Sequence, residues 1–457
     1  MKKRPIWIIV VFMSILVLGT MITAVITQAQ QSGYTYLPII QKPEATPTPS
    51  PTPSPTSTPS PTPSPTPDPS GMVELRGMWV TRFDWTSYSS AADPAKIDEI
   101  VNNAAYAGFN AIFFQVRGIG DAYYQSNVEP WASRISGVGL GVAPNPYWDP
   151  LADLISKAHA QNIQVHAYIN VYPVWNGSQC DDPPDPAVLP QHIYWKLLNA
   201  HGNTSGKNNG LIWNTSGQVS CGTYMRATPA SIVHDDHLMS VATDIVTRYD
   251  VDGLHLDHIR YDRSTSCDPV SAAAAGVPCF SFPPAGYNSY QDWQRAQVNG
   301  TVFKFYDQIV PLKPGLWLSA AVWPLYIDYW GWGGTEGHHD YYQDSKAWVG
   351  GGYIDSISPM IYGGTVWDTG ATGRVRWQML VQDFQNDSHG RYIIPGIGAD
   401  YSDFYDIESR IQMARQIGTA GHALFSYGAL NSHSYFDDLR NGPYADTAVP
   451  PTIPWHP

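Results

Sequence analysis

Short apolar runs alternate with helical patterns along the chain from Glu74 onward. In the clearest run, Leu254 and Leu256 have the two-residue spacing of a pleated strand, and Asp257 follows where that strand should end. Strands that alternate with helices are typical of a parallel sheet. We predict strands at 75–81, 111–117, 164–171, 253–259, 316–323, 355–362, 392–399 and 422–427.

The intervening helices carry clear boundary signals. Asp93 precedes Pro94 and Asp149 precedes Pro150, which in both places puts a capping carboxylate before a proline in the first helical turn. Gly108 is placed to end the first of these helices, because glycine readily adopts the left-handed conformation found there. Two more helices are predicted at 293–309 and 407–417.

Eight strands that alternate with helices predict an α/β fold, a single (β/α)8 or TIM barrel, over residues 71–442. This unit exceeds the typical length of about 250 residues. The excess lies in two loops, 172–231 and 261–288, which follow the third and fourth strands. Such loops lie on the active-site face of a barrel, so we expect them to build a substrate groove. The tail at 443–457 is rich in proline and is expected to be irregular.

The N-terminal residues predict export. Three basic residues, 2–4, precede an apolar run of about 20 residues, which is long enough to span a bilayer. Residues 1–29 are therefore either a signal peptide cut near Ala29 or an uncleaved membrane anchor, and in both cases the rest of the chain is extracellular or cell-surface. Residues 43–70 alternate Pro with Thr and Ser, which is typical of an extended, disordered linker.

Composition narrows the choice of partner. A net charge of −13 argues against nucleic acid, which rewards clustered Lys and Arg. The chain holds 17 Trp and 28 Tyr, which suits either a surface that stacks on sugar rings or a large aromatic core.

The four cysteines indicate disulfides, because their number is even and the chain is expected to be exported. Three pairings are possible. The nearest-neighbour pairing joins Cys180 to Cys221 and Cys267 to Cys279. No C-x-x-C spacing is present, so we expect no zinc site on these cysteines.

Several segments resemble one known family when they are taken together. They are ELRGMWVT at 74–81, FQVR at 114–117 with GDA at 120–122 and EPW at 129–131, VHAYIN at 165–170, DVDG at 250–253 leading to Asp257 and RY at 260–261, and SPMIY at 358–362. In this order they resemble the glycosyl-hydrolase-like family ten over residues 74–430. The resemblance implies an exported TIM-barrel glycoside hydrolase that acts on bacterial cell-wall glycan, particularly strands stripped of peptides. Two positions depart from the family pattern, which often has a second acid where this chain has His258 and a proline where it has Asp262.

Asp257 is the first candidate for catalysis, because the carboxyl ends of the strands form the active-site face of a barrel. Its alternative role is to orient the loop by pairing with Arg260. Glycoside hydrolysis generally needs two carboxyl groups. The partner candidates are Asp400 after the seventh strand and Glu336 after the fifth, followed by Asp84 after the first.

Other polar and aromatic residues at strand ends are candidates for substrate contact. They are Arg117, Asp121, Asn170, Tyr172, Arg260, Trp323 and Tyr362, with Trp175, Trp330, Trp332 and Trp367 as further stacking candidates. Arg117 and Asp121 could instead form an ion pair that closes the barrel mouth.

We expect no metal and no cofactor. His338 and His339 are adjacent, so they point in different directions, and no spaced histidine pair or phosphate-binding glycine loop is present.

The leading hypothesis is an exported glycoside hydrolase acting on a polysaccharide, with the membrane as a second partner if the N-terminal segment stays uncleaved. The alternatives are a non-catalytic carbohydrate-binding protein on a degenerate barrel and a hydrolase of a different polymer.

Overall fold

The computed structural model describes residues 71–456, except 264–265, 280 and 364–369. The described residues fall within one compact unit. The predictions for 1–29, 43–70 and Trp367 lie outside them. In the described part of the chain, no helix combines the length and the apolar character needed to cross a bilayer.

The centre of the fold is a parallel sheet. Within the described residues it has nine strands, in the order β12-β11-β10-β9-β4-β3-β2-β14-β13. Their bounds are β2 (Leu75–Val80), β3 (Ala111–Arg117), β4 (Gln164–Asn170), β9 (Gly253–Asp257), β10 (Trp317–Val322), β11 (Ser356–Pro359), β12 (Tyr392–Ile393), β13 (Gly396–Gly398) and β14 (Gly421–Phe425). Eight of these nine strands fall within a predicted one, and β14 begins one residue before its predicted start.

The prediction of one continuous strand at 392–399 was wrong. The segment forms two short strands, and these are the outer strands of the sheet although only Ile394 and Pro395 separate them. The Ile394 N–H donates to the carbonyl of Ile357 in β11 at 3.0 Å, whereas the carbonyl of Pro395 accepts from Ala423 in β14 at 3.1 Å. Pro395 has no N–H to give to a ladder, so it interrupts the strand. The sheet curls into a TIM-barrel-like arrangement whose two outer strands follow each other in the chain.

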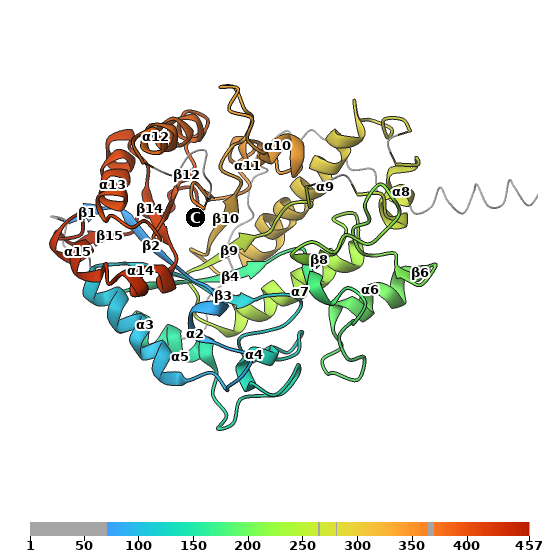
Figure 1. Ribbon diagram of the computed structural model, residues 1–457, viewed down its shortest axis with the longest axis horizontal. Helices are drawn as coiled ribbons and strands as arrows, with labels where there is room; N and C mark the ends of the chain where they lie inside the picture. Colours follow the sequence, from blue (N-terminus) through green and yellow to red (C-terminus); the bar gives the residue numbers. More distant parts are fainter. Residues whose placement is uncertain (1–70, 264–265, 280, 364–369, 457) are drawn as a thin grey trace, which may run out of the picture. The chain divides into compact units, whose positions relative to one another are not determined.

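Helices surround the sheet (Figure 1). The long ones are α3 (Pro94–Ala107), α5 (Pro150–His159), α7 (Ile232–Arg248), α9 (Tyr290–Lys304), α12 (Gly370–Asn386) and α13 (Tyr405–Ile417). Asp93 caps α3 by accepting from the Ala95 N–H at 2.9 Å, and Gly108 ends it at φ 92°, as predicted. The helix predicted at 293–309 is α-helical only to Lys304 and continues as a π-helical turn, Phe305–Ile309, and a 3-10 turn, Val310–Leu312.

The shorter elements lie mostly in the loops. The helices are α2 (Arg82–Trp85), α4 (Ser133–Ser136), α6 (Ile193–His201), α8 (Pro269–Ala275), α10 (Gly337–Asp340), α11 (Ser345–Gly350), α14 (Tyr427–His433) and α15 (Phe436–Asn441), with a 3-10 turn at Gly177–Gln179. The strands are β1 (Met72–Val73), β5 (Pro173–Asn176), β6 (Asn203–Thr204), β7 (Lys207–Asn208), β8 (Tyr224–Arg226) and β15 (Ala448–Val449).

The two faces of the sheet have different cores. Leu254 and Leu256 of β9 belong to the large apolar cluster between the sheet and the helices. The concave side holds a smaller, aromatic cluster that includes Trp79, Phe113 and Tyr168. Because side chains alternate along a strand, the residues next to the two leucines in β9, His255 and Asp257, belong to the concave side.

The C-terminal tail is more ordered than the sequence predicts. Its strand β15 pairs in parallel with β1, and the indole N–H of Trp455 donates to the Asp355 carboxylate at 2.6 Å. The expectation of an irregular tail is therefore wrong at 448–449. Proline-rich composition did not reveal this pairing because its partner lies about 370 residues earlier in the chain.

One of the two predicted disulfides is present. Cys180 and Cys221 are joined across the loop that follows β4, with their Cα atoms 5.9 Å apart. The predicted Cys267–Cys279 bond is wrong, because both are free thiols. The Cys279 thiol donates to the carbonyl of Ser266 at 3.7 Å, and burial together with the neighbouring Cys279 thiol raises the pKa of Cys267 to about 12.

Candidate active site

Asp257 ends β9 at the carboxyl edge of the sheet, beside Asn170 of β4. Its carboxylate accepts three hydrogen bonds. The Tyr168 hydroxyl donates to Oδ2 at 2.7 Å, while the His258 N–H and the Arg260 guanidinium donate to Oδ1 at 2.6 and 3.3 Å. His258 adopts a left-handed backbone conformation, φ 50°. The Asp257 side chain is 12% exposed, so it is held in place but still reaches the surface of the mouth.

The surroundings of Asp257 keep it ionised. Burial alone would raise its pKa, but electrostatic interactions with His258 and Arg260 and the hydrogen bonds from Tyr168 and the His258 N–H outweigh burial and hold the pKa well below its usual value. Burial lowers the pKa of His258 itself to about 3, so its imidazole is neutral at neutral pH and Arg260 supplies the positive charge. An ionised Asp257 can attack, accept a proton or stabilise a cation, but it has no proton to donate.

The layer beneath Asp257 is neutral. The indole N–H of Trp79 donates to Nε2 of His255 at 3.1 Å, so Nδ1 carries the ring proton and donates to the Ser319 hydroxyl at 2.7 Å. Burial lowers the pKa of His255 to about 3. Asp257 therefore receives no positive charge from below, and its charge is balanced at the mouth of the site.

Aromatic rings form the walls around this carboxylate. Tyr224 of β8 faces His258 edge-on, with ring centroids 5.2 Å apart, and Arg82 donates to its hydroxyl at 2.9 Å. The Arg260 guanidinium lies 5.6 Å from the Trp323 ring and 5.8 Å from the Tyr341 ring. Such a combination of charged groups and ring faces suits a polar, ring-shaped ligand.

Four predicted site residues gather near Asp257. Arg260 and Trp323 surround it as described, and Asn170 lies beside it in the register of β4 and β9. Tyr362 stacks on Phe425 with centroids 4.8 Å apart, and burial together with the Asp257 charge raises its pKa well above the usual value.

The two predicted carboxyl partners do not contact Asp257 in the described part of the chain. Glu336 is held within its own loop, where one oxygen accepts from the Asp328 N–H at 2.8 Å and the other contacts His339. Asp400 follows β13 and is exposed. Their assignment as partners of Asp257 stays a prediction.

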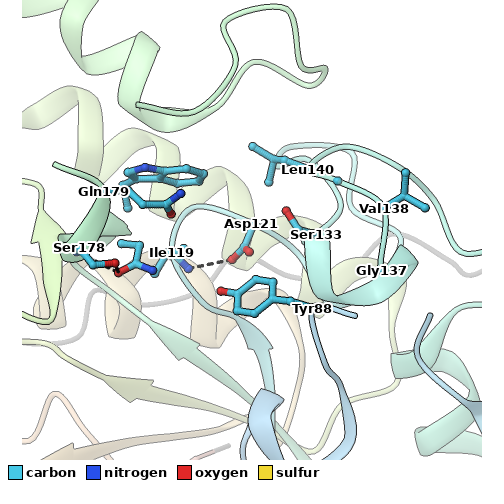
Figure 2. A pocket seen from close by; sticks show the side chains of 12 residues that line it. Tyr88, Ile119, Asp121, Ser133, Gly137, Val138, Leu140, Ser178 and Gln179 are labelled. Carbon is cyan, nitrogen blue, oxygen red and sulfur yellow. Dashed lines mark hydrogen bonds between the residues drawn. The ribbon is translucent and has the colours of Figure 1, made fainter. Parts of the chain in front are cut away.

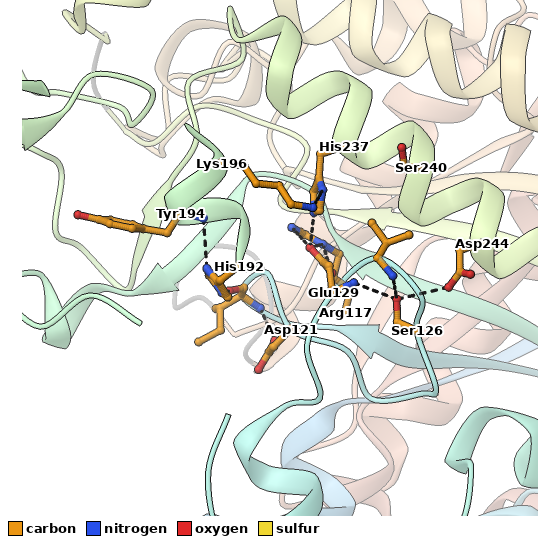
Figure 3. Close-up of polar contacts among 12 residues, drawn as sticks. Arg117, Asp121, Ser126, Glu129, His192, Tyr194, Lys196, His237, Ser240 and Asp244 are labelled. Atoms are coloured by element: carbon orange, nitrogen blue, oxygen red, sulfur yellow. Dashed lines mark hydrogen bonds and ion pairs between the residues drawn. The ribbon is translucent and has the colours of Figure 1, made fainter. Parts of the chain in front are cut away.

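Arg117 belongs to a buried charge network (Figure 3). It pairs with Glu129 at 2.9 Å, not with Asp121, and donates to the carbonyl of Val171 at 3.1 Å. Glu129 also contacts His237 at 2.8 Å. Burial would raise the pKa of Glu129, but Arg117 and His237 outweigh it and keep the group ionised. Arg117 is fully buried, so the prediction that it contacts substrate is disfavoured and its evident task is to fix the end of β4.

Tyr172 is also fully buried, and its hydroxyl donates to Thr301 of α9 at 3.0 Å. This placement disfavours the predicted contact with substrate. Asp121, in contrast, lines a cavity of about 530 Å³ beside the mouth (Figure 2).

Sequence patterns missed Tyr168, Tyr224 and Arg82. Tyr168 could have been found, because it lies two residues before Asn170 and therefore on the same face of β4. Tyr224 reaches the mouth only through the antiparallel pairing of β5 with β8, which carries no strong sequence signal. Arg82 lies one residue past the predicted end of the first strand, in the short helix α2.

Among the described residues, no group of three His, Cys, Asp or Glu side chains is arranged to hold a metal ion. The rings of His338 and His339 are nearly perpendicular, at 85°.

A curled parallel sheet with a carboxylate at a strand end and aromatic walls around it is the arrangement expected of an active site in a TIM-barrel-like fold. Comparison with known proteins agrees. The family model described as Glycosyl hydrolase-like 10 matches residues 74–379, and the chain belongs to this family.

Two named relatives cover much of the chain. It is 24% identical to glycosyl hydrolase YngK of Bacillus subtilis, over 84% of this chain and 74% of that protein. It is 27% identical to glycosyl hydrolase DigH of Escherichia coli, over 63% of this chain and 65% of that protein. The chain thus spans about two thirds to three quarters of these relatives.

Solved structures show the same fold at low identity. The PgaB (BpsB) glycoside hydrolase domain from Bordetella bronchiseptica is similar with a TM-score of 0.56 at 12% identity, over 80% of this chain and 98% of that chain. Alpha-L-fucosidase isoenzyme 2 from Paenibacillus thiaminolyticus has a TM-score of 0.52 at 15% identity, over 81% of this chain and 49% of that chain.

Proposed function

We propose that this protein is an exported glycoside hydrolase that cleaves the glycosidic bonds of peptide-free glycan strands of the bacterial cell wall. The observation that carries the proposal is Asp257, an ionised strand-end carboxylate in a member of a glycosyl-hydrolase-like family. In such a site the carboxylate either attacks the anomeric carbon or deprotonates the water that does.

Positive charge at the mouth supports a glycan that carries carboxylates, as the muramic acid units of cell-wall strands do. Arg82 donates a hydrogen bond to the Tyr224 hydroxyl, a neutral partner that does not balance the positive charge of Arg82. Arg226, from the same strand as Tyr224, pairs with Asp262 at 3.1 Å. Arg260 and Arg226 are each paired with one carboxylate, whereas none of the described carboxylates forms an ion pair with Arg82, so the arginines at the mouth outnumber the acids paired with them and favour an anionic ligand.

The first test is cleavage of peptide-free glycan strands by the purified protein with its disulfide formed, followed by mass spectrometry. We expect shortened strands from the wild type and a loss of about 10³-fold or more in Asp257→Asn, because the amide cannot carry the negative charge. Asp185→Asn is the matched control. Asp185 is an exposed loop acid that accepts one backbone N–H at 2.8 Å, and we expect this variant to keep wild-type activity.

Other outcomes separate the alternatives. Wild-type activity in Asp257→Asn would remove Asp257 from the mechanism. A wild type that binds the strands without shortening them would support the non-catalytic carbohydrate-binding protein. Cleavage of another polysaccharide, but not of these strands, would overturn the substrate and keep the reaction.

Export is a separate part of the proposal and depends on the sequence of residues 1–29. Alkaline phosphatase fused after residue 70 should be active outside the cytoplasm, because this enzyme needs an oxidising compartment to form its disulfides. A fusion that stays in the cytoplasm would contradict export.

A further inference from the structure

The cavity beside the mouth lies over the carboxyl ends of three adjacent strands. Its lining comes from the loops after β2, β3 and β4 and includes Tyr88, Ile119, Asp121, Ser133, Trp175 and Gln179. Asp257 ends β9, the strand next to β4. The cavity volume of about 530 Å³ and its mixture of ring faces, amides and hydroxyls suit sugar units rather than an apolar ligand.

Asp121 is the carboxyl group in this lining. Figure 2 shows it in the middle, with Ile119 and Gln179 on one side and Ser133 and Leu140 on the other. Its Oδ1 accepts from the Ile119 N–H at 2.8 Å, and among the described residues its Oδ2 accepts no hydrogen bond. The side chain is almost wholly buried, so that oxygen faces the cavity rather than bulk water.

A short chain of contacts connects Asp121 to Asp257. Asn170, which lies beside Asp257, donates to the carbonyl of Gly118 at 3.0 Å. The Gly118 N–H in turn donates to the backbone carbonyl of Asp121 at 3.4 Å. Asp121 lies in the loop after β3, and Asp257 ends β9. These two strands are separated by β4 in the sheet, so their axes lie about 10 Å apart. Glycosidases place their two carboxyl groups about 5 to 9.5 Å apart, a span that side chains reaching from such strands can bridge.

We propose that Asp121 is the second carboxyl group of the reaction, and that it protonates the glycosidic oxygen of the sugar held in this cavity. This assignment depends on the proposed glycoside hydrolase activity. The proton passes from Asp121 to the glycosidic oxygen as the bond from that oxygen to the anomeric carbon breaks. The departing sugar keeps the bonding electrons and leaves as an alcohol. The electron pair for the new bond at the anomeric carbon comes from Asp257, or from a water molecule whose proton Asp257 accepts. If Asp257 attacks, a water molecule then breaks the bond between the sugar and Asp257 and gives its proton to Asp121, which restores both acids.

The charges around the two acids divide the roles in the same way. Burial raises the pKa of Asp121, and the negative charge of Glu129 raises it further. The Ile119 N–H, Arg82 and Arg117 lower the pKa of Asp121, but they do not cancel the rise. The pKa of Asp257 is displaced in the opposite direction. When the environments of two carboxyl groups push their pKa values apart, the group with the raised pKa acts as the acid and the group with the lowered pKa stays ionised.

Asp84, which follows β2 at the same edge of the sheet, is engaged elsewhere. Burial also raises the pKa of Asp84, but one of its oxygens accepts from the Thr81 N–H at 2.7 Å and the other from the Ser426 hydroxyl at 3.3 Å. These bonds cap α2 and tie it to the end of β14. Asp84 therefore has a structural task, whereas one oxygen of Asp121 remains available to a ligand.

The test compares two substrates that differ in their need for an acid. One is the peptide-free glycan strand. The other is the 2,4-dinitrophenyl glycoside of the sugar that the wild type releases. Its leaving group, 2,4-dinitrophenolate, departs without a proton. We expect Asp121→Asn to lose about 10³-fold in kcat/KM on strands and to stay within about 10-fold in kcat/KM on the aryl glycoside, because kcat/KM reports the step in which the leaving group departs. Asp257→Asn should lose activity on both, and Asp185→Asn on neither.

Equal losses on both substrates, or none on either, would overturn the assignment of Asp121. The asparagine amide oxygen can still accept from Ile119, and thermal unfolding checks that the variant is folded. If it is not, the wild type decides alone. Its kcat/KM should fall at high pH on strands, as Asp121 loses its proton, and should not fall on the aryl glycoside. The same fall on both substrates would overturn the proposal. A wild type that cleaves no glycan would instead overturn the proposed function itself.

Discussion

Hydrogen bonds to the charged form determine what Asp257 can do. Tyr168, the His258 N–H and Arg260 all donate to its carboxylate, and donors of this kind stabilise the ionised form. Asp121 lines a cavity and accepts one hydrogen bond, from the Ile119 N–H. This single bond does not offset the rise in pKa that burial causes. The same amino acid is thus given two chemical characters by its neighbours.

Tyr168→Phe tests this at the scale of one hydroxyl. It removes a 2.7 Å hydrogen bond to the Asp257 carboxylate without changing the shape of the ring. A hydrogen bond to a charged group is worth about 1.5 to 3 kcal/mol, so its loss should raise the pKa of Asp257. The sign is fixed because the lost bond stabilises only the ionised form.

The measurement is the pH dependence of kcat/KM. We expect the acidic limb of Tyr168→Phe to move to higher pH than in the wild type, with a lower plateau near neutral pH. Tyr172→Phe is the matched control, because its hydroxyl is buried against Thr301, away from Asp257. An unmoved acidic limb would show that the Tyr168 hydroxyl does not stabilise the reacting carboxylate.

At the scale of elements, the loop after β4 brings side chains to the mouth. Its strands β5 and β8 pair antiparallel, and this pairing carries Tyr224 and Arg226 toward Asp257. The Cys180–Cys221 disulfide joins the two arms of the loop just beyond the paired strands, across a sequence separation of 41 residues. The bond therefore limits how far Tyr224 can move away from the site.

Loss of this disulfide should loosen the loop more than the sheet. The double variant Cys180→Ser with Cys221→Ser should be less stable by about 2 to 4 kcal/mol, because a closed loop of this size restricts the unfolded chain. We also expect a higher KM, since Tyr224 is less firmly held. Thermal unfolding and kinetics under oxidising conditions measure both effects. Cys279→Ser, which removes a free thiol, is the control, and unfolding of the double variant at the wild-type temperature would contradict the prediction.

The alternation of apolar and polar residues was enough to predict the strands and to place Asp257 at a strand end. It could not reveal that Pro395 divides a strand, because the ladder partners of that segment lie in two other strands. Nor could it pair Arg117 with Glu129 instead of Asp121, since all three lie close together in the sequence. Cys267 and Cys279 show the same limit, because an even count predicts bonds but does not place two sulfur atoms in bonding geometry.

At the scale of the whole molecule, the two ends of the described chain are joined beneath the sheet. Glu74 pairs with Arg76 at 2.9 Å and with Arg415 of α13 at 2.8 Å. Arg415 also donates to the carbonyl of Pro443 at 2.7 Å, and Arg76 to that of Asp446 at 2.8 Å. One buried carboxylate thus links the first long strand, the last long helix and the tail, on the face opposite to the candidate site.

Glu74→Gln should destabilise the fold and leave the chemistry of the mouth intact. Removing one partner of a buried ion pair leaves uncompensated charge, at a cost of about 3 kcal/mol. Asp98→Asn is the control, because Asp98 pairs with Lys157 at 2.6 Å and its side chain is exposed at the surface, where an ion pair contributes less than about 1 kcal/mol. Denaturant unfolding at neutral pH measures the difference, and equal effects of the two variants would contradict the assigned role.

The pH dependence of this difference provides a sharper test. Burial would raise the pKa of Glu74, but Arg415, His422 and Arg76 outweigh it and lower the pKa from 4.5 to about 2. A carboxyl group whose pKa is depressed by folding stabilises the fold fully above its unfolded pKa, and this contribution disappears as the pH falls through the folded value. The gap in unfolding free energy between wild type and Glu74→Gln should therefore be constant above about pH 5 and narrow between pH 4.5 and 2. A gap that stays constant down to pH 2 would mean that Glu74 acts through packing or hydrogen bonding, and that its charge does not hold the two ends of the chain together.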